Sequence, residues 1–249
     1  MSVPFRDYFS AQSNQYAKYR PTYPPELFEF LASVVEKHEL AWDCGTGNGQ
    51  AAIGLAMFFE RVIATDPSAD QLRNAFRNPK VEYRQARGED SGLEGGSVDM
   101  VTVAQALHWF EVEDFYKEVR RCVKPGGTIA IWGYALSRVS DELDVILDRF
   151  YYETVGPYWP KQREHMDAAY RSLSFPFEEL VAPEFRIEVM WDLGDMVAYL
   201  RTWSPVQRYI EAHGEDPVVI VEEELEEIWG DPLEKRAVGF PVFMRVGMV

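Results

Sequence analysis

The chain has 249 residues, of which 47% are hydrophobic and 27% charged, as in an ordinary globular protein of one large domain. Its formal net charge of −16 disfavours a nucleic-acid partner, because the lysines and arginines are scattered and form no basic patch for a phosphate backbone. Two cysteines are too few for a disulfide framework or a metal cluster. No segment is apolar enough to span a bilayer, and Met1–Asp7 lacks the apolar core of a signal peptide. We therefore expect a cytoplasmic protein with no membrane partner.

The first half of the chain alternates between strand-like and helix-like segments joined by short links. Short runs of apolar residues, some alternating with polar ones, predict strands at 40–44, 61–66, 81–86, 98–105 and 128–134. The segments between them predict helices at 50–59, 67–76 and 113–123, and Pro67 suits the first turn of the second helix. This alternation predicts an α/β fold with a doubly wound, mostly parallel sheet that has helices on both faces.

The second half breaks this rhythm and predicts a helical cap inserted after the fifth strand. Helices are predicted at 141–154, 162–173, 195–203, 205–212 and 217–229, and strands at 185–191 and 237–248. The last two strands predict a final antiparallel pair in a seven-stranded sheet. We divide the single domain, 1–249, into an N-terminal lid segment (1–30), a cofactor-binding core (40–134), the cap (135–180) and the C-terminal strands and helices (181–249).

The segment Ala41–Gly49 is the most informative in the chain. It follows a predicted strand and opens a predicted helix, and glycines stand at the alternate positions 45, 47 and 49. Glycine lets the backbone pass close to a bound molecule where a Cβ would collide. The helix that follows points its free N–H groups and positive dipole end at that molecule. The segment therefore predicts a loop that binds a nucleotide-type cofactor.

Two cofactors compete for this loop, a nicotinamide dinucleotide and S-adenosylmethionine. Asp66, at the end of the second strand, would bind ribose hydroxyls in either case. Gly49 comes one position earlier than the dinucleotide pattern requires. The charge of Asp43 would repel a pyrophosphate but suits an ammonium and a sulfonium. We therefore predict S-adenosylmethionine, and a nicotinamide-dependent oxidoreductase or a non-catalytic cofactor-binding protein are the alternatives.

Four motifs in chain order resemble those of class I S-adenosylmethionine-dependent methyltransferases. They are Asp43–Gly49, Asp66–Ser68, Gln105–Phe110 and Lys124–Gly127. The similarity is greatest to the type-11 branch that includes trans-aconitate methyltransferase-like proteins, which share segments similar to Tyr16–Pro24 and Tyr199–Ser204. The resemblance implies the Rossmann-like methyltransferase fold and methyl transfer, but it specifies the cofactor better than the substrate.

The first two motifs imply most of the cofactor site. Asp43 would hold the cofactor's amino group, directly or through water, unless it only braces the loop. Gly45 and Gly47 are the positions of close backbone approach. Asp66 would bind the ribose, with Pro67 beside it.

The resemblance also places residues around the adenine and the methionine part of the cofactor. Gly88 and Glu89 follow the third strand and would read the adenine, although Arg87 stands where relatives often carry an acid. The backbone carbonyl of Gln105 would meet the cofactor's ammonium. Arg20 would pair with the methionine carboxylate, because a guanidinium binds a carboxylate through two parallel hydrogen bonds.

His108 is the candidate catalytic residue. The alternative is that His108 is only a buried polar side chain that packs beside Trp109. A hydroxyl acceptor would need such a base, whereas a carboxylate is already ionised at neutral pH. We therefore predict a small-molecule substrate, with a carboxylate oxygen as the first candidate for the methylated atom. We predict no metal site, and the sequence leaves the oligomeric state open. Residues that could recognise this substrate are the cap arginines and aromatics Arg138, Arg163, Arg171, Arg201, Tyr151, Tyr152, Tyr158 and Trp159.

Overall fold

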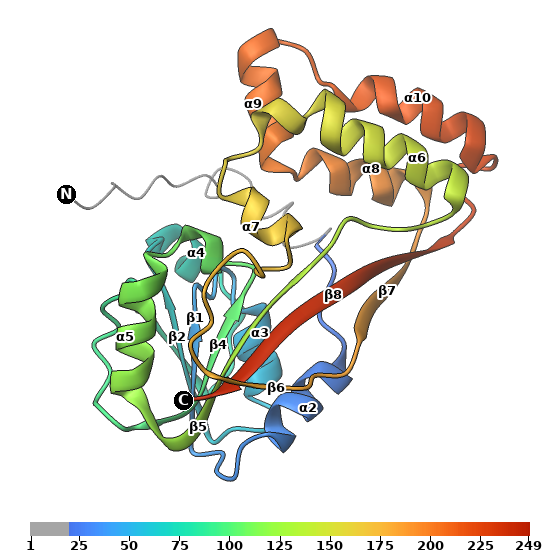
Figure 1. The fold of residues 1–249 in the computed structure, drawn as a ribbon. Coiled ribbons are helices and arrows are strands. Elements are labelled where there is room, and N and C mark those ends of the chain that lie inside the picture. Colours follow the sequence, from blue (N-terminus) through green and yellow to red (C-terminus); the bar gives the residue numbers. More distant parts are fainter. Residues whose placement is uncertain (1–19) are drawn as a thin grey trace.

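The structure, a computed structural model, describes residues 20–249, so most of the predicted lid segment lies outside the described residues. Within that range the chain forms one eight-stranded sheet (Figure 1). Its strands are β1 Leu40–Cys44, β2 Arg61–Asp66, β3 Val81–Gln85, β4 Val98–Ala104, β5 Val123–Tyr134, β6 Glu178–Leu180, β7 Phe185–Trp191 and β8 Arg236–Met248.

The strand order confirms the predicted sheet. The order is β3-β2-β1-β4-β5-β8-β6, and β7 pairs with the first half of β8. Strands β1 to β5 are parallel, and β8 is antiparallel to β5, β6 and β7. The eighth strand, β6, is the addition to the seven predicted, because its three residues are too few to show an alternating pattern.

Helices cover both faces of the parallel part of the sheet, as a doubly wound fold requires. They are α2 Pro25–Ser33, α3 Gln50–Leu55, α4 Ala69–Arg73 and α5 Val112–Cys122. Helices α2 and α3 share one hydrophobic core, and α5 packs into another on the opposite face. The sequence did not predict α2, and α3 is shorter than the predicted 50–59. Helix α4 begins only after Pro67, because the Ser68 side chain caps it by accepting a hydrogen bond from the Gln71 N–H.

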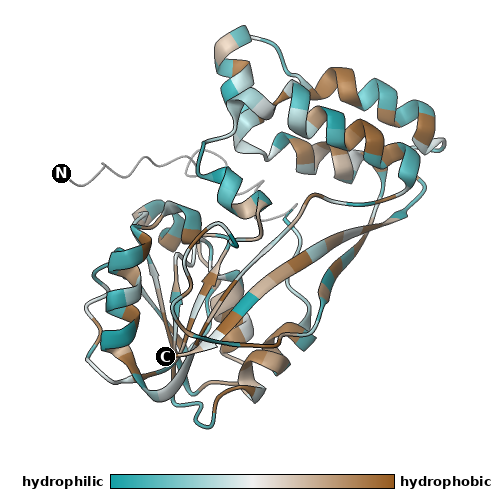
Figure 2. Ribbon diagram, in the orientation of Figure 1, coloured by the Kyte–Doolittle hydropathy of each residue, from teal (hydrophilic) through white to brown (hydrophobic). Residues whose placement is uncertain are grey.

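The cap is a second layer of helices beyond the carboxyl ends of the parallel strands (Figure 1). It contains α6 Asp141–Arg149, the π-helix η3 Phe150–Thr154, the short η4 Gly156–Tyr158, α7 Arg163–Asp167, α8 Leu193–Arg201, α9 Ser204–His213 and α10 Val218–Trp229. Its helices carry both apolar and hydrophilic residues (Figure 2). Leu147, Leu200 and Leu225, from α6, α8 and α10, are fully buried in one shared core. The helical layer therefore draws on segments well beyond the predicted cap range, 135–180.

Two predicted helices of the cap have different bounds in the structure. The predicted helix 141–154 is an α-helix that continues as a π-helix. The predicted helix 162–173 ends at Asp167, because Ala169 and Tyr170 adopt left-handed backbone conformations with φ of 50° and 56°. Few residues other than glycine adopt this conformation, so the turn after α7 is strained.

The long strand β8 joins the two layers. Val238 and Phe240 are buried in the cap core, and Val246 is buried in the core beside α2 and α3. Figure 1 shows the strand running from the cap to the far end of the sheet. Among residues 20–249 no helix has the length and apolarity needed to cross a bilayer, and no cluster of metal-ligating side chains is present.

Candidate active site

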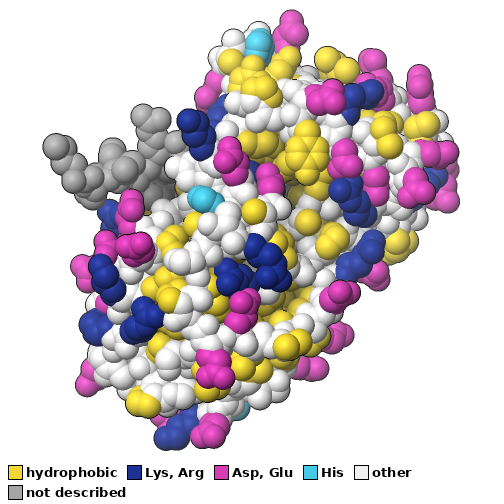
Figure 3. Space-filling view, in the orientation of Figure 1, with side chains coloured by type: hydrophobic (Ala, Val, Ile, Leu, Met, Phe, Trp, Pro, Cys, Tyr) yellow, Lys and Arg dark blue, Asp and Glu magenta, His cyan; other side chains and the backbone are white. Residues whose placement is uncertain are grey.

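A cavity of about 510 Å³ lies at the carboxyl edge of the parallel strands, beneath the cap. Its walls come from the loops that follow β1, β2, β3 and β4, from the end of β5, and from α7. In open α/β sheets ligands bind at this edge. On the face drawn in Figure 3, acidic and basic side chains are spread over both layers around exposed hydrophobic ones.

The loop after β1 has the backbone that the three glycines predicted. Gly45, Gly47 and Gly49 have φ of 70°, 54° and 87°, which side chains rarely tolerate. A Cβ at Gly45 would lie 2.5 Å from the Cβ of Ala106, whereas one at Gly47 would have its nearest atom, on Gln71, at 4.0 Å. The first glycine therefore permits close packing, and the second keeps the backbone bare where it faces the cavity.

Asp66 and Pro67 line the cavity where β2 ends. The Asp66 carboxylate accepts hydrogen bonds from the backbone N–H groups of Gly47 and Ser68, at 2.9 and 2.8 Å. The Asp66 carboxylate thus faces the cavity while it is held by the backbone on either side. The structure thus brings Gly45, Gly47, Asp66 and Pro67 together around one cavity, and their contact with the cofactor stays a prediction.

Asp43 has a different position from its predicted neighbours in the site. It is fully buried and does not line the cavity. Its two oxygens accept hydrogen bonds from the hydroxyls of Thr46 and Thr102, at 2.6 and 2.8 Å. Burial raises the pKa of Asp43 to about 6. This geometry is that of a residue that braces the glycine loop, and contact of Asp43 with the cofactor's amino group stays a prediction.

Gly88 and Glu89 line the end of the cavity formed by the loop after β3. Glu89 accepts a hydrogen bond from the Glu111 N–H at 2.8 Å and forms an ion pair with Arg87 at 3.2 Å. Arg87 therefore holds Glu89, the residue predicted to bind the adenine, in an ion pair. A Cβ at Gly88 would lie 3.1 Å from both Cys44 and Phe110, so the loop packs tightly here.

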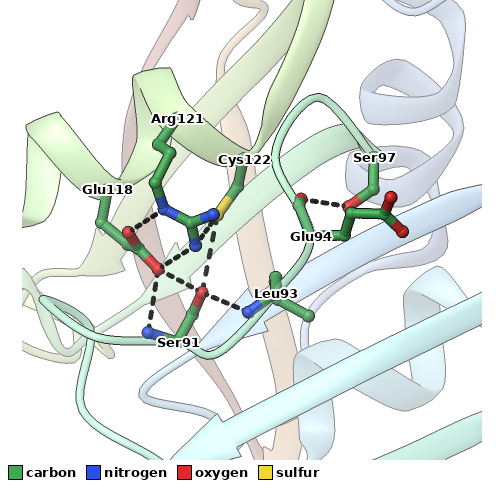
Figure 4. A network of polar contacts seen from close by, with 7 residues as sticks. All are labelled: Ser91, Leu93, Glu94, Ser97, Glu118, Arg121 and Cys122. Carbon is green, nitrogen blue, oxygen red and sulfur yellow. Dashed lines mark hydrogen bonds and ion pairs between the residues drawn. The ribbon is translucent and has the colours of Figure 1, made fainter.

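A polar network that no sequence pattern predicted anchors this loop to α5 (Figure 4). Glu118 accepts hydrogen bonds from the Ser91 N–H at 3.0 Å and from the Arg121 guanidinium at 2.7 Å. The bonds from Arg121, together with those from Ser91, lower the pKa of Glu118 to about 2. Cys122 belongs to this network through Arg121, at 3.1 Å, and its thiol is buried. The network fixes the segment that presents Gly88 and Glu89.

Arg20 and Gln105 line the cavity on the side of β4 and β5. The Arg20 guanidinium donates to the Tyr134 hydroxyl at 3.0 Å and stands over the ring of Tyr199. Gln105 has a strained backbone, with φ of 57°, and its N–H donates to the Trp132 carbonyl at 2.8 Å. Its side-chain Nε2 is buried without a hydrogen-bond partner among residues 20–249. Such a group is costly to bury, so a polar ligand at this end would be stabilised by it.

His108 also lines the cavity, and the residue is only 8% exposed. Its Nδ1 lies 3.0 Å from the Tyr170 hydroxyl, which belongs to the strained turn after α7. Burial lowers the pKa of His108 to about 3, with smaller contributions from the charges of Arg163 and His165. The imidazole is therefore neutral at physiological pH, and its catalytic role stays a prediction.

The cavity walls also contain residues that sequence reasoning missed. Gln162, just before α7, and His165, on α7, line the cavity, with Leu173 from the loop beyond and Tyr134 from the end of β5. No local pattern marks these residues, because the fold of the cap decides which side of α7 faces the core. Trp109 also lines the cavity, although the sequence predicts it only as a packing residue beside His108.

None of the predicted substrate arginines lines the cavity. Arg138 pairs with Asp148, Arg201 pairs with Asp216, and Arg163 is held by the Tyr151 hydroxyl at 2.9 Å. The cap aromatics are also absent from the cavity walls. Tyr151 and Trp159 instead pack with Trp203 in or against the cap core.

Comparisons with known proteins identify the family. A family model described as a methyltransferase domain matches residues 42–131, the stretch that supplies most of the cavity walls. A Dictyostelium discoideum protein named as a methyltransferase is 36% identical over 248 residues, which cover 96% of this chain and 94% of that protein. The chain belongs to the class I S-adenosylmethionine-dependent methyltransferases.

Other relatives of this methyltransferase agree. A solved structure from Anaeromyxobacter dehalogenans, described as a type II methyltransferase, is 43% identical and superimposes with a TM-score of 0.87 over 92% of this chain and 97% of that chain. The yeast protein CRG1, named as an S-adenosylmethionine-dependent methyltransferase, is 33% identical over 132 residues, which are 49% of this chain and 45% of CRG1. The prediction of S-adenosylmethionine rather than a nicotinamide dinucleotide is confirmed.

Proposed function

We propose that this methyltransferase methylates an oxygen of a small molecule, with a carboxylate as the first candidate. The observation that carries the proposal is the state of His108, the predicted base. Its Nδ1 is engaged by Tyr170, and burial lowers its pKa to about 3, so it is a poor proton acceptor. A carboxylate needs no base, because it is ionised at neutral pH.

Bound S-adenosylmethionine supplies an electrophilic methyl group: the acceptor's lone pair forms a bond to the methyl carbon as the carbon–sulfur bond breaks, which leaves S-adenosylhomocysteine. The protein's task is then to align the two reactants and exclude water. Asp66 and the glycine loop would hold the adenosine, and Gly88 and Glu89 would bound the adenine. Helix α7 would cover the acceptor.

The charge and size of the acceptor end support a small acid. Arg20 is the arginine that lines this end, since Arg87 lies at the adenine end in its ion pair with Glu89. Whether Arg20 binds the methionine carboxylate or the acceptor, it makes this end favourable for a negative charge. The unpartnered Nε2 of Gln105 adds a neutral donor. A cavity of about 510 Å³ shared with the cofactor leaves room for a small acceptor only.

The test is transfer of isotope from methyl-labelled S-adenosylmethionine to panels of acids, phenols and amines. The acid panel starts with polycarboxylic acids, because the motifs resemble those of trans-aconitate methyltransferase-like proteins. We expect base-labile methyl esters. Labelled phenols or amines without any ester would refute carboxylate methylation, and a phenol would point to His165, the other imidazole at the cavity, as a base.

We also propose that the protein works in the cytoplasm and does not bind nucleic acid. Cys44 and Cys122 are both free and buried, which suits a reducing compartment. The net charge of −16 opposes binding to a phosphate backbone. Retention on a DNA or RNA column at physiological salt would contradict the second proposal.

A further inference from the structure

The contact between His108 and Tyr170 joins the two layers of the molecule. His108 stands on the short helix η2 Leu107–Trp109, after β4, and Tyr170 stands in the turn after α7. The two rings lie nearly parallel, at 24°, with centroids 6.1 Å apart. Both side chains are buried, and the hydroxyl of Tyr170 lies 3.0 Å from Nδ1 of His108. The direction of this hydrogen bond decides which ring nitrogen carries the proton.

The surroundings of the hydroxyl oxygen fix that direction. Tyr170 is fully buried, so water does not reach its hydroxyl. The phenol hydrogen also needs an acceptor, and among residues 20–249 the one given by the hydrogen bonds of Tyr170 is His108 Nδ1. Tyr170 therefore donates, and Nδ1 of His108 accepts.

The other ring nitrogen of His108 must then carry the hydrogen. The ring is neutral, so a proton absent from Nδ1 resides on Nε2. Among residues 20–249 Nε2 has no hydrogen-bond partner, and His108 lines the same cavity as Gln105. An N–H group in this position is a donor and cannot take a proton from the acceptor.

We propose that Tyr170 locks His108 as a neutral Nε2–H donor that binds an oxygen of the methyl acceptor, so that His108 is a binding residue and Tyr170 its positioning residue. The proposal rests on the proposed function in that it names the acceptor's partner within the same cavity. It explains why the chain keeps two strained left-handed residues, Ala169 and Tyr170: that turn, closed by the Tyr170 N–H bonded to the His165 carbonyl at 2.7 Å, brings the phenol back to the core.

The tautomer is measured on the full-length protein by NMR of its ring-¹⁵N-labelled histidines, with S-adenosylhomocysteine bound. The chain has four histidines, and His108→Gln identifies the signal of His108. We expect Nε2 to be protonated and Nδ1 to be bare at pH 7. A proton on Nδ1, or a doubly protonated ring, would overturn the proposal. This readout does not require a known substrate.

The acceptor role is tested with His108→Gln and His108→Ala on whichever acceptor the isotope assay identifies. A glutamine amide places an N–H near the position of Nε2 but cannot act as a base. We expect His108→Ala to lose about tenfold to a hundredfold in kcat/KM, the range for a hydrogen bond to a charged group, and His108→Gln to recover most of it. Equal losses in both variants would show that His108 acts as a base and would refute the proposal while leaving methyl transfer intact.

The positioning role is tested with Tyr170→Phe, and Tyr116→Phe is the matched control. Tyr116 is also a buried tyrosine of the same hydrophobic core, and its hydroxyl donates to the Ser174 carbonyl at 3.0 Å, but it does not line the cavity. We expect both variants to lose similar stability, but Tyr170→Phe alone to mix the two His108 tautomers and raise the KM of the acceptor several-fold. An unchanged tautomer in Tyr170→Phe would contradict the lock.

Discussion

In the core the predicted site residues stand at or shortly after the carboxyl end of a strand, whereas the cap reaches the cavity from one short helix between irregular segments. Asp66 ends β2, and Gln105 follows β4, so their places at the carboxyl edge follow from the sheet alone. His165 reaches the same cavity because α7 packs against η2, a contact between distant parts of the chain. We propose a division of labour in which the core binds the cofactor, and the cap recognises the acceptor together with His108 of the core.

The largest effect is expected from Gly45→Ala in the core. A left-handed alanine costs about 1–2 kcal/mol, and the added Cβ would lie 2.5 Å from Ala106, where overpacking adds about 1–3 kcal/mol. Gly126→Ala is the matched control, because Gly126 also has a positive φ, 80°, but an added Cβ meets no atom within 4 Å. Chemical denaturation should show a loss of about 2–5 kcal/mol for Gly45→Ala and about 1–2 kcal/mol for Gly126→Ala. Equal losses would mean that the loop is not packed as described.

Asp66→Ala should weaken cofactor binding without unfolding the core. Loss of charged acceptors for the ribose hydroxyls should reduce affinity for S-adenosylhomocysteine about 100-fold, or about 3 kcal/mol, in calorimetry. Asp70→Ala, on α4 close by, removes an acid that pairs with Arg73 and does not line the cavity. Its affinity should equal that of the unaltered protein. A similar loss in both variants would indicate a general electrostatic effect and not a ribose contact.

Asp43→Asn should stabilise the protein at neutral pH. Because burial raises the pKa of Asp43 from 3.8 to about 6, the native state holds the proton more tightly than the unfolded chain does. Below pH 4 Asp43 is protonated in both states, so its burial does not lower the free energy of unfolding. As the pH rises to about 6 the unfolded chain ionises first, and at pH 7.5 the native state bears the full cost of a buried charge. Asparagine removes that cost, so the free energy of unfolding should rise by about 1–3 kcal/mol at pH 7.5 and change little near pH 4.

The control for Asp43→Asn is its affinity for S-adenosylhomocysteine. If the charge also attracts the cofactor's ammonium, the affinity of the stabilised variant should fall. Unchanged affinity would leave bracing of the loop as the role of Asp43. Destabilisation at both pH values would show that the bonds from Thr46 and Thr102 outweigh the cost of burying the charge.

The smallest effect is expected in the cap. His165→Ala should raise the KM of the acceptor about fivefold, or about 1 kcal/mol, and leave the affinity for S-adenosylhomocysteine unchanged, because its position on α7 faces the acceptor end. Glu164→Ala, on the same helix but away from the cavity walls, is the control. A fall in cofactor affinity for His165→Ala would break the division between core and cap.

What could be predicted from the sequence follows the same division. The glycine loop, Asp66 and the loop after β3 could be placed because a residue that ends a parallel strand has its position fixed by the sheet. The acceptor end could not, because Gln162 and His165 reach it only through the packing of α7 on the core. The prediction that the cap arginines line the substrate site was wrong for the same reason. Arg138 and Arg201 instead form ion pairs with acidic residues of the cap.

Three residues show how backbone strain escapes sequence reasoning. Gln105, Ala169 and Tyr170 all adopt positive φ, although none is glycine. Two of them, Gln105 and Tyr170, stand in or next to the acceptor end. Such conformations persist only where the surrounding fold imposes them, so no local pattern predicts them.

The most direct test of the division between core and cap is a crystal structure with S-adenosylhomocysteine bound. We expect the ribose hydroxyls on Asp66, the adenine beside Gly88 and Glu89, and the sulfur directed toward His108 and α7. A ribose bound away from Asp66, or a sulfur directed away from α7, would contradict the account.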